Sequence, residues 1–254
     1  MTSWRLIPYG RFPPALNMAI DEVMQESGGG IFRCYGWDPP GLSLGYFQKV
    51  TDAEIDGWLR RKWGVVRRVT GGGALLHQHE LTFSLAVDEA AHPALAETGL
   101  SYDAMNRCLL ALLAELGVVA RPRGEDPGFM PDGVTKRSEA PFLCFLRENR
   151  YDLVMDRGKI VGTAQRRTGG RILHHGSLVT GPSDLPQGEA PLGSYVPQVP
   201  SWEELTARFV RQVARQFGIT FETKPLTDGE ISRAREIVKT KFGNRDWVRE
   251  GGRA

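Results

Sequence analysis

The sequence predicts an α+β fold in which a mixed β-sheet is flanked by helices, with a small helical region at the C-terminal end. Two observations predict it. Strand-like and helix-like patterns of apolar residues occur along the whole chain, without the regular alternation of a parallel βαβ protein. The chain has 254 residues, of which 41% are hydrophobic and 24% charged. It is therefore long and apolar enough to bury a substantial core, in one large domain or two smaller ones.

The first quarter of the chain predicts three strands and two helices. WRLIPY, residues 4–9, has strand character, and ALNMAIDEVMQES, residues 15–27, has helical spacing until a run of glycines ends it. IFRCYGW, residues 31–37, and LSLGYFQ, residues 42–48, predict two strands separated by a DPPG turn. TDAEIDGWLRRKW, residues 51–63, opens with a threonine cap and an acidic first turn, which indicates a helix.

The middle of the chain predicts most of the remaining sheet. Residues 65–87 predict a strand, a glycine loop and one or two further strands, and residues 101–117 form the longest helical pattern. Residues 121–140 have no periodicity and predict a mobile loop. YDLVMDRGKIVGTAQRR, residues 151–167, predicts a hairpin around a DRGK turn, and residues 171–180 predict a third strand beside it.

The C-terminal part predicts helices after a linker. Residues 181–201 are rich in Pro, Gly and Ser and are the best candidate linker. Residues 201–218 and 227–243 are amphipathic and begin with capping residues. We expect residues 1–200 to form the main domain and residues 201–254 to pack on it as a helical segment, because this tail is too short for a separate accessory domain.

Composition also narrows the possible partners and compartment. The formal net charge is +2 and no charged tail is present, so the sequence does not indicate a nucleic-acid partner. The N-terminus lacks a signal-peptide pattern, and no apolar run approaches the roughly 18 residues that a membrane span needs. We therefore expect a cytoplasmic protein that binds neither nucleic acid nor membrane.

The first group of candidate site residues lies in RRVTGGGALLHQHELTFS, residues 67–84. Three consecutive glycines can bring backbone N–H groups close to an anion, and Arg67 and Arg68 lie beside them. The loop could hold a phosphate or a pantetheine-linked carbonyl, or it could be a plain hairpin with solvent-facing arginines. On a strand His77 and His79 would face the same side, but no Cys, Asp or Glu completes a metal set. Structural histidines are the simpler interpretation, and no metal site is expected.

A second group lies on the predicted hairpin and the strand after it. Lys159 follows a tight turn directly, so its ammonium could project into a cleft or lie in solvent. His174 and His175 would point to opposite faces of a strand, so at most one of them faces any given site.

The three cysteines are too widely spaced for a disulfide framework or a zinc ribbon. Cys34 and Cys108 lie in apolar strand and helix patterns and predict core positions. Cys144, in APFLCF, comes shortly before the hairpin that bears Lys159. Because a nearby cation stabilises a thiolate, Cys144 and Lys159 would make an acyl-transfer pair if the fold brought them together.

Five motifs, in this order, resemble those of the lipoate-protein ligase and octanoyltransferase superfamily, which shares its catalytic fold with biotin-protein ligases. They are PALNMAIDEVM, FRCYGWDPPGLSLGYFQ, RRVTGGGALLHQHELTFSL, GKIVGTAQRR and ILHHGSL. The tail KTKFGNRDWVREG is similar to the closing helix of the family. The resemblance covers most of the chain and implies the biotin/lipoate-protein ligase catalytic fold for residues 1–200.

The branch that the chain most resembles loads the glycine cleavage H protein. Its members take octanoyl from acyl carrier protein onto a cysteine and pass it to a carrier lysine, without a cofactor. The resemblance implies that Cys144 is the nucleophile and that Lys159 stabilises its thiolate and polarises the acyl carbonyl. It also implies a set of residues around the acyl group or an adenylate: Arg67, Arg68, Gly71, Gly72, Gly73, Ala74, His77, Gly162, Ala164, His175 and Gly176.

Two alternatives remain open at the level of sequence. The loop TGGGALLH is closer to the ligase wording, and ligases of this superfamily use ATP and magnesium to form lipoyl-adenylate. A non-catalytic member that binds lipoyl domains or acyl groups is the other alternative. In each case we expect a monomer whose partner is the glycine cleavage H protein or a lipoyl domain of a 2-oxoacid dehydrogenase.

Overall fold

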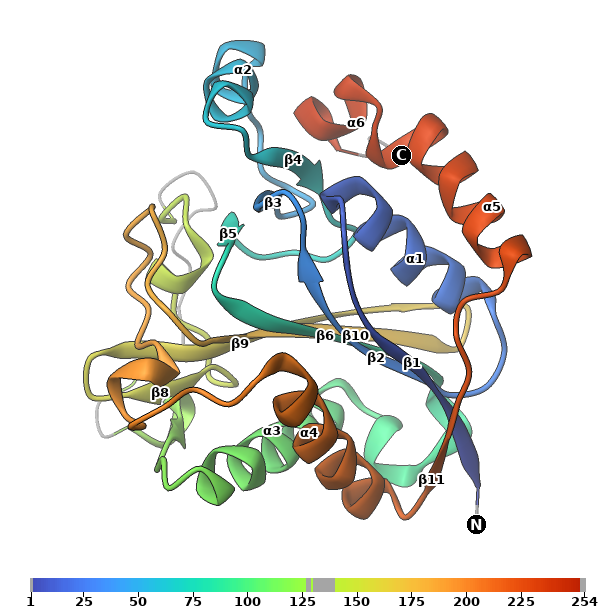
Figure 1. Ribbon diagram of the computed structural model, residues 1–254, viewed down its shortest axis with the longest axis vertical. Helices are drawn as coiled ribbons and strands as arrows, with labels where there is room; N and C mark the ends of the chain where they lie inside the picture. Colours follow the sequence, from blue (N-terminus) through green and yellow to red (C-terminus); the bar gives the residue numbers. More distant parts are fainter. Residues whose placement is uncertain (1, 127–128, 130–139, 252–254) are drawn as a thin grey trace.

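The computed structural model describes residues 2–126, 129 and 140–251. In this part of the chain eight strands form one mixed sheet, in the order β11-β1-β2-β6-β10-β9-β8-β7 (Figure 1). β1 is parallel to both of its neighbours, and all other neighbouring pairs are antiparallel. The bounds are β1 (Ser3–Phe12), β2 (Ile31–Trp37), β6 (Glu80–Asp88), β7 (Arg121–Pro122), β8 (Leu153–Met155), β9 (Gly158–Thr168), β10 (Arg171–Val179) and β11 (Thr220–Thr223).

A smaller sheet carries the glycine loop. β3 (Gly41–Leu44) lies between β4 (Gly64–Arg67), to which it is parallel, and β5 (Leu75–His77), to which it is antiparallel. Residues 68–74, which include the three glycines, connect β4 to β5. α2 (Asp52–Arg60) precedes β4 and begins with a capping box between Thr51 and Glu54.

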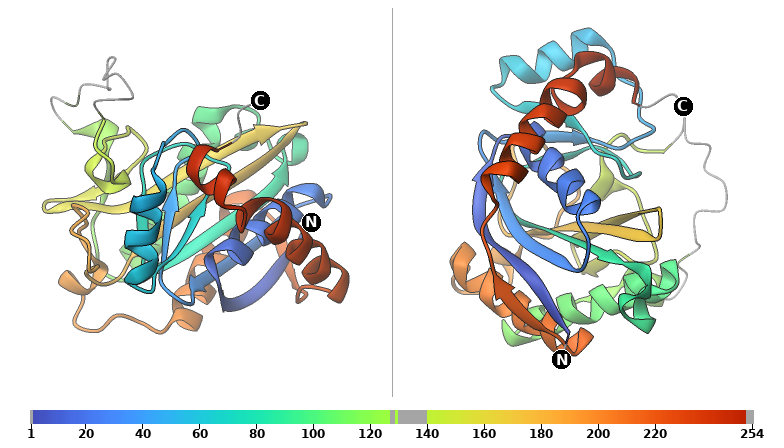
Figure 2. Two further views of the ribbon diagram at one scale, coloured as in Figure 1. Left: turned by 90° about the horizontal axis from the view of Figure 1, so that it is seen from above. Right: turned by 90° about the vertical axis from the view of Figure 1, so that its right-hand side faces the viewer.

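Helices cover both faces of the large sheet (Figures 1 and 2). α3 (Thr98–Glu115) and α4 (Trp202–Phe217) pack on one face, where their apolar sides meet Phe32 and Phe83 of the central strands. α1 (Pro14–Glu26) covers the other face, and α5 (Asp228–Ile237) packs on the outer side of α1. These layers confirm the predicted α+β fold with a mixed sheet flanked by helices.

Most predicted elements are present, but two end earlier than expected and one strand was not predicted. The strand expected over residues 42–48 ends at Leu44, because Gly45 lies against the glycine loop: a Cβ on Gly45 would be 2.0 Å from the carbonyl oxygen of Gly72. The helix expected over residues 227–243 changes after Ile237 into a π-helical turn, Val238–Phe242, which α6 (Arg245–Glu250) follows. The short strand β11 was not predicted.

Of the two segments predicted to be irregular, the structure describes mainly the second, residues 181–201. The candidate linker, residues 181–201, packs on the large sheet: Lys159 N donates to Gly188 O, and Ala190 N donates to Lys159 O. Leu192 in this segment is buried. The prediction of a mobile loop over residues 121–140 falls mostly outside the described residues.

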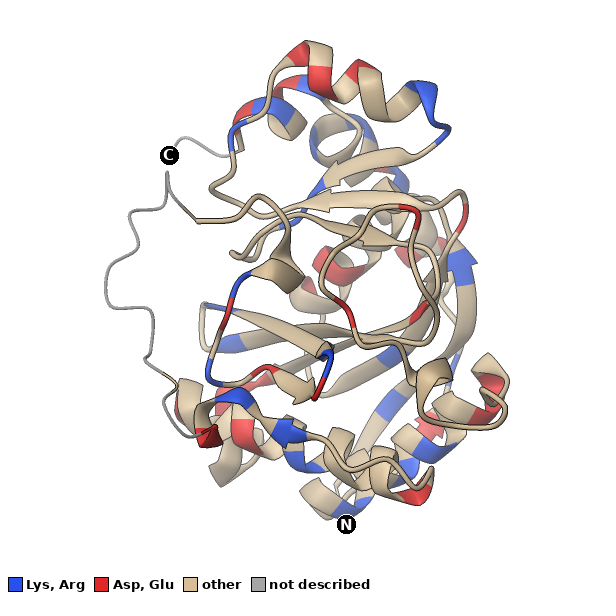
Figure 3. Cartoon of the chain, turned by 90° about the vertical axis from the view of Figure 1, so that its left-hand side faces the viewer, with Lys and Arg blue, Asp and Glu red and all other residues tan. Residues whose placement is uncertain are grey.

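Charged side chains lie mainly on the outer elements. Figure 3 shows basic and acidic residues interspersed over the peripheral helices and loops, in keeping with the small net charge of +2. Within the described residues, no helix combines the length and the apolar character that a membrane crossing requires.

Candidate active site

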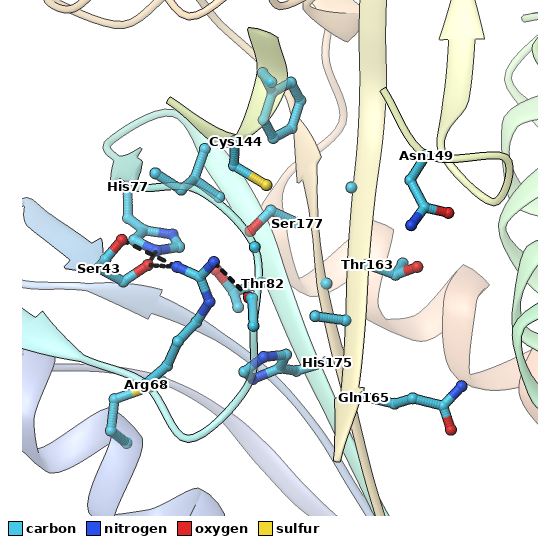
Figure 4. Close-up of a pocket in the computed structure, with 18 of the residues that line it drawn as sticks. Ser43, Arg68, His77, Thr82, Cys144, Asn149, Thr163, Gln165, His175 and Ser177 are labelled. Carbon is cyan, nitrogen blue, oxygen red and sulfur yellow. Dashed lines mark hydrogen bonds between the residues drawn. The ribbon is translucent and has the colours of Figure 1, made fainter. Parts of the chain in front are cut away.

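A cavity of about 250 Å³ opens beside the glycine loop, and both sheets contribute to its walls (Figure 4). Most of its exposed wall is apolar, and polar side chains such as Ser43, Thr163 and Gln165 also line it, a mixture that suits a small-molecule site. Nine of the residues expected at the site line this cavity: Arg68, Gly71, Gly72, His77, Cys144, Gly162, Ala164, His175 and Gly176.

Cys144 is held on the glycine loop by its main chain. It opens a short 3₁₀ turn, Cys144–Leu146, and its N–H donates to the carbonyl of Ala74 over 2.7 Å. Ala74 N–H donates to Phe142 O over 2.8 Å, so the segment before Cys144 pairs with the loop like a strand. Only a glycine fits beside it, because a Cβ on Gly73 would lie 2.7 Å from Cys144 N. The thiol itself is partly exposed and lines the cavity.

Lys159 meets Cys144 through the main chain. Its Nζ donates to Cys144 O over 3.1 Å and to Arg147 O over 2.8 Å, and it pairs with Asp152 Oδ2 at 2.7 Å. The three hydrogens of the ammonium group therefore have three acceptors, and Lys159 is only 5% exposed. Burial raises the pKa of Asp152, and the Lys159 charge opposes this rise. Lys159 thus fixes the turn that begins with Cys144, and it is not among the residues lining the cavity.

Arg68 is the cation on the cavity side of the cysteine. Its Nη1 donates to the carbonyl and the hydroxyl of Ser43 over 3.0 and 2.9 Å, and its Nη2 donates to Gly71 O and Gly73 O over 2.9 and 2.6 Å. These bonds hold the glycine loop closed around the guanidinium. Burial lowers the pKa of Arg68, and a negative charge on Cys144 opposes this effect.

Arg67, which was expected at the site, lies on the opposite side of the strand. Its guanidinium donates to five backbone carbonyls, those of Gly45, Tyr46, Trp247, Val248 and Arg249. It therefore ties α6 to the small sheet and does not line the cavity. Successive side chains of an extended chain point to opposite faces, so only one of two adjacent arginines could reach the cavity. The structure thus brings Arg68, but not Arg67, to the cavity.

His77 belongs to a buried hydrogen-bond chain. Its Nε2 is 2.7 Å from the hydroxyl of Ser43, and its Nδ1 bonds Glu80 Oε1. The same carboxylate oxygen accepts from the hydroxyls of Thr82 and Ser177 over 2.6 and 2.8 Å. Sequence analysis missed Ser43 and Glu80. The pattern HQHE did place a carboxylate three residues after His77, and a bend between β5 and β6 lets the two meet.

His175, His174 and His79 differ in their position relative to the cavity. His175 lines the cavity, with its Nε2 2.6 Å from Thr70 Oγ1 and its Nδ1 3.5 Å from Asp21 Oδ2, and burial lowers its pKa. His174 points to the other face of β10 and contacts Tyr102, as the predicted alternation requires, and burial lowers its pKa to about 3. His79 is exposed, so it does not share a side with His77.

The remaining expected residues act through close packing. Gly176 leaves no room for a side chain, because a Cβ there would lie 2.6 Å from Thr163 Cγ2.

Cys34 and Cys108 are buried in the core as predicted, and burial raises the pKa of each thiol to about 12. No cluster of three or more His, Cys, Asp or Glu side chains suited to a metal ion occurs among the described residues.

The fold of this chain is that of the lipoate-protein ligases. A putative lipoate protein ligase from T. acidophilum superposes with a TM-score of 0.75 at 22% identity, covering 98% of this chain and 99% of that one. A lipoate-protein ligase A bound with ATP gives a TM-score of 0.75 at 23% identity and covers 98% of each chain. Residues 13–215 match the family described as Lipoyl protein ligase A/B catalytic domain, and the chain belongs to this family.

Relatives that match over almost the whole chain carry a more specific name. A protein of Symbiobacterium thermophilum named Octanoyltransferase LipM is 34% identical over 97% of this chain and 98% of its own length. Another protein of this name, from Geobacillus kaustophilus, is 32% identical over 96% of this chain and 97% of its own. These comparisons confirm the superfamily that the motifs indicated.

Proposed function

We propose that the protein transfers an octanoyl group to a lysine of a lipoyl carrier protein through a thioester formed on Cys144. The observation that carries this proposal is the position of the Cys144 thiol at an apolar cavity, with its main chain bonded to Ala74 and Lys159. The name octanoyltransferase on relatives that match nearly the full chain supports the same reaction.

The proposed cycle has two half-reactions. In the first, the sulfur of Cys144 attacks the thioester carbonyl of octanoyl-acyl carrier protein, and the pantetheine thiolate leaves and takes up the cysteine proton. In the second, a carrier lysine attacks the thioester on Cys144, a C–N bond forms, and the thiolate of Cys144 leaves. Arg68 supplies positive charge beside the thiolate, and Lys159 holds the turn on which Cys144 lies.

The same contacts disfavour the ATP-dependent alternative. An adenylate held by Lys159 would need a free ammonium, yet all three hydrogens of Lys159 already have acceptors. The four Nη hydrogens of Arg68 are also taken, by Ser43 and by loop carbonyls. The described residues therefore do not fit ATP bound through these two cations, and in our proposal neither ATP nor magnesium takes part.

The acceptor is the glycine cleavage H protein or a lipoyl domain; a T. acidophilum ligase of the same fold is described together with its E2 lipoyl domain. Residues 1–200 act as the catalytic domain, with residues 201–254 packed on it. In this proposal the donor is acyl carrier protein, and the protein acts as a monomer in the cytoplasm.

Intact-mass measurement after mixing with octanoyl-acyl carrier protein tests this function. The expected result is an octanoyl adduct that disappears in Cys144→Ser and persists in the matched variant Cys108→Ala, whose thiol is buried in α3. Carrier loading that needs ATP and free acid, and that survives Cys144→Ser, would establish a ligase instead. Binding of carrier without loading in either assay would establish the non-catalytic alternative.

A further inference from the structure

The second half-reaction needs a proton acceptor, and this requirement rests on the proposed function. An amine that attacks a thioester carries an N–H proton that must leave before a stable amide results. Neither cation near Cys144 can take it. Arg68 already donates its four Nη hydrogens to Ser43 and the glycine loop, and Lys159 donates its three hydrogens to Asp152 and two carbonyls.

The hydrogen-bond chain at the cavity wall has the donor and acceptor order of a proton relay. Ser43 Oγ accepts a hydrogen bond from Arg68, so its own proton points to Nε2 of His77. The ring proton of neutral His77 is then on Nδ1, facing Glu80. Oε1 of Glu80, which contacts this ring nitrogen, also accepts from the hydroxyls of Thr82 and Ser177. His77 Nε2 is therefore a basic nitrogen, reached from the cavity through one hydroxyl.

The relay lies on the same wall as the cysteine (Figure 4). The Cys144 segment pairs with Ala74, the residue just before β5. Leu75 packs in one cluster with Cys144, and residues two apart on a strand share a face, so His77 is the next side chain along this wall after Leu75. Leu75, His77 and Ser43 all line the cavity. An amine at a thioester on Cys144 would thus share this cavity with the relay.

We propose that Ser43 and His77 take up the proton of the attacking carrier lysine, and that Glu80 stabilises the resulting imidazolium. As the lysine nitrogen bonds the acyl carbon, its proton passes to Ser43 Oγ while the hydroxyl proton passes to His77 Nε2. The C–S bond then breaks and leaves the thiolate of Cys144, which later takes the proton back from the imidazolium. The products are the amide and the free thiol, so atoms and charge balance.

The charged groups around His77 agree with a transient imidazolium. Glu80 faces its Nδ1 and favours the cation, and the thiolate of Cys144 would return the proton after each turnover. On the other side, Arg68 contacts Ser43 and places a positive charge next to the relay. Trp37 stacks on the ring with centroids 3.8 Å apart, which fixes its orientation. His175 does not offer the same path, because its partners Thr70 and Asp21 belong to the glycine loop and to α1.

The inference is tested by measuring the two half-reactions separately in the His77→Gln variant. Octanoyl-acyl carrier protein is mixed with the enzyme and the adduct on Cys144 is timed by quenched intact mass; purified H protein with its lysine unmodified is then added. We expect adduct formation within about threefold of wild type, and transfer slowed by roughly 10²-fold or more. The transfer rate of the variant should rise steadily with pH, because hydroxide then replaces the missing base. His79→Gln is the matched control, since His79 is exposed and outside the cavity.

Three results would overturn the inference. Transfer in His77→Gln at the wild-type rate would exclude His77 as proton acceptor. Equal slowing of both half-reactions would assign it a purely structural role, and an unchanged pH profile would do the same. Ser43→Ala provides an independent check, with transfer expected to slow more than adduct formation. If wild type itself forms no adduct on Cys144, it is the proposed function that fails, and this is distinct from every result above.

Discussion

Replacing Lys159 by methionine tests whether this lysine acts mainly by fixing the turn at Cys144. Its ion pair with Asp152 is buried, with both side chains 5% exposed. Removal of one partner from a buried pair costs about 3–5 kcal/mol, because the remaining charge has no compensation. For a chain of this length such a loss lowers the melting temperature by roughly 6–20 °C.

The loss should depend on pH in a defined direction. Burial raises the pKa of Asp152 and Lys159 opposes the rise, so without Lys159 the pKa in the folded state rises further. A carboxyl whose folded pKa is raised stabilises the protein at low pH and loses this contribution as pH rises through that pKa. Lys159→Met should therefore be less destabilised at pH 5 than at pH 8.

Urea unfolding followed by tryptophan fluorescence at the two pH values measures both effects. The double variant Asp152→Asn/Lys159→Met is the matched control, because it removes both charges and should return to within about 2 kcal/mol of wild type. A penalty below about 1 kcal/mol for the single variant, or one equal at both pH values, would refute the assigned role. The rate of Cys144 acylation in the stable double variant then shows whether catalysis needs the lysine charge.

Three further predictions concern the loop, the C-terminal helix and the core. Gly73→Ala should destabilise the fold by about 1–3 kcal/mol and expose the Cys144 segment to faster alkylation, while Gly71→Ala, whose Cβ meets nothing within 4 Å, should melt like wild type. Arg67→Leu should lower the free energy of unfolding by about 3–5 kcal/mol and speed amide hydrogen exchange in α6. Equal exchange rates in α6 of the variant and of wild type would contradict this prediction. His174→Phe should be less destabilised by acid than wild type. Because the pKa of buried His174 is about 3, wild type should lose about 2–3 kcal/mol of its free energy of unfolding between neutral pH and pH 4.5, and denaturant titration of both proteins measures this loss.

The order of strands and helices could be predicted because the periodicity of apolar residues follows from burial within each element. The helix at α1 and the hairpin of β8 and β9 were found to within a few residues for this reason. β11 was missed because TFET has only one large apolar residue, and its pairing with β1 depends on the tertiary fold. The end of β3 at Leu44 likewise depends on the close approach of Gly45 to a loop that is distant in sequence.

The site could be predicted only as a set of residue types. Motif order indicated the glycine loop, Cys144 and Lys159, but spacing does not show whether a side chain or a carbonyl makes the contact. Asp152 and Glu80 were missed because single acidic residues in strand-like runs carry no signal until their partners are known. Both are buried beside a basic group, and only the fold brings these pairs together.

The arginine doublet links the C-terminal helix to the site, although only one of its members faces the cavity. Arg67 bonds the last turn of α6, and Arg68 bonds the carbonyls of the glycine loop. The main chain beneath both arginines is fixed separately, because Arg67 pairs with Leu44 of β3 and Arg68 N donates to Leu44 O over 3.0 Å. One arginine therefore attaches the helical tail to the small sheet, and the other holds the glycine loop beside Cys144.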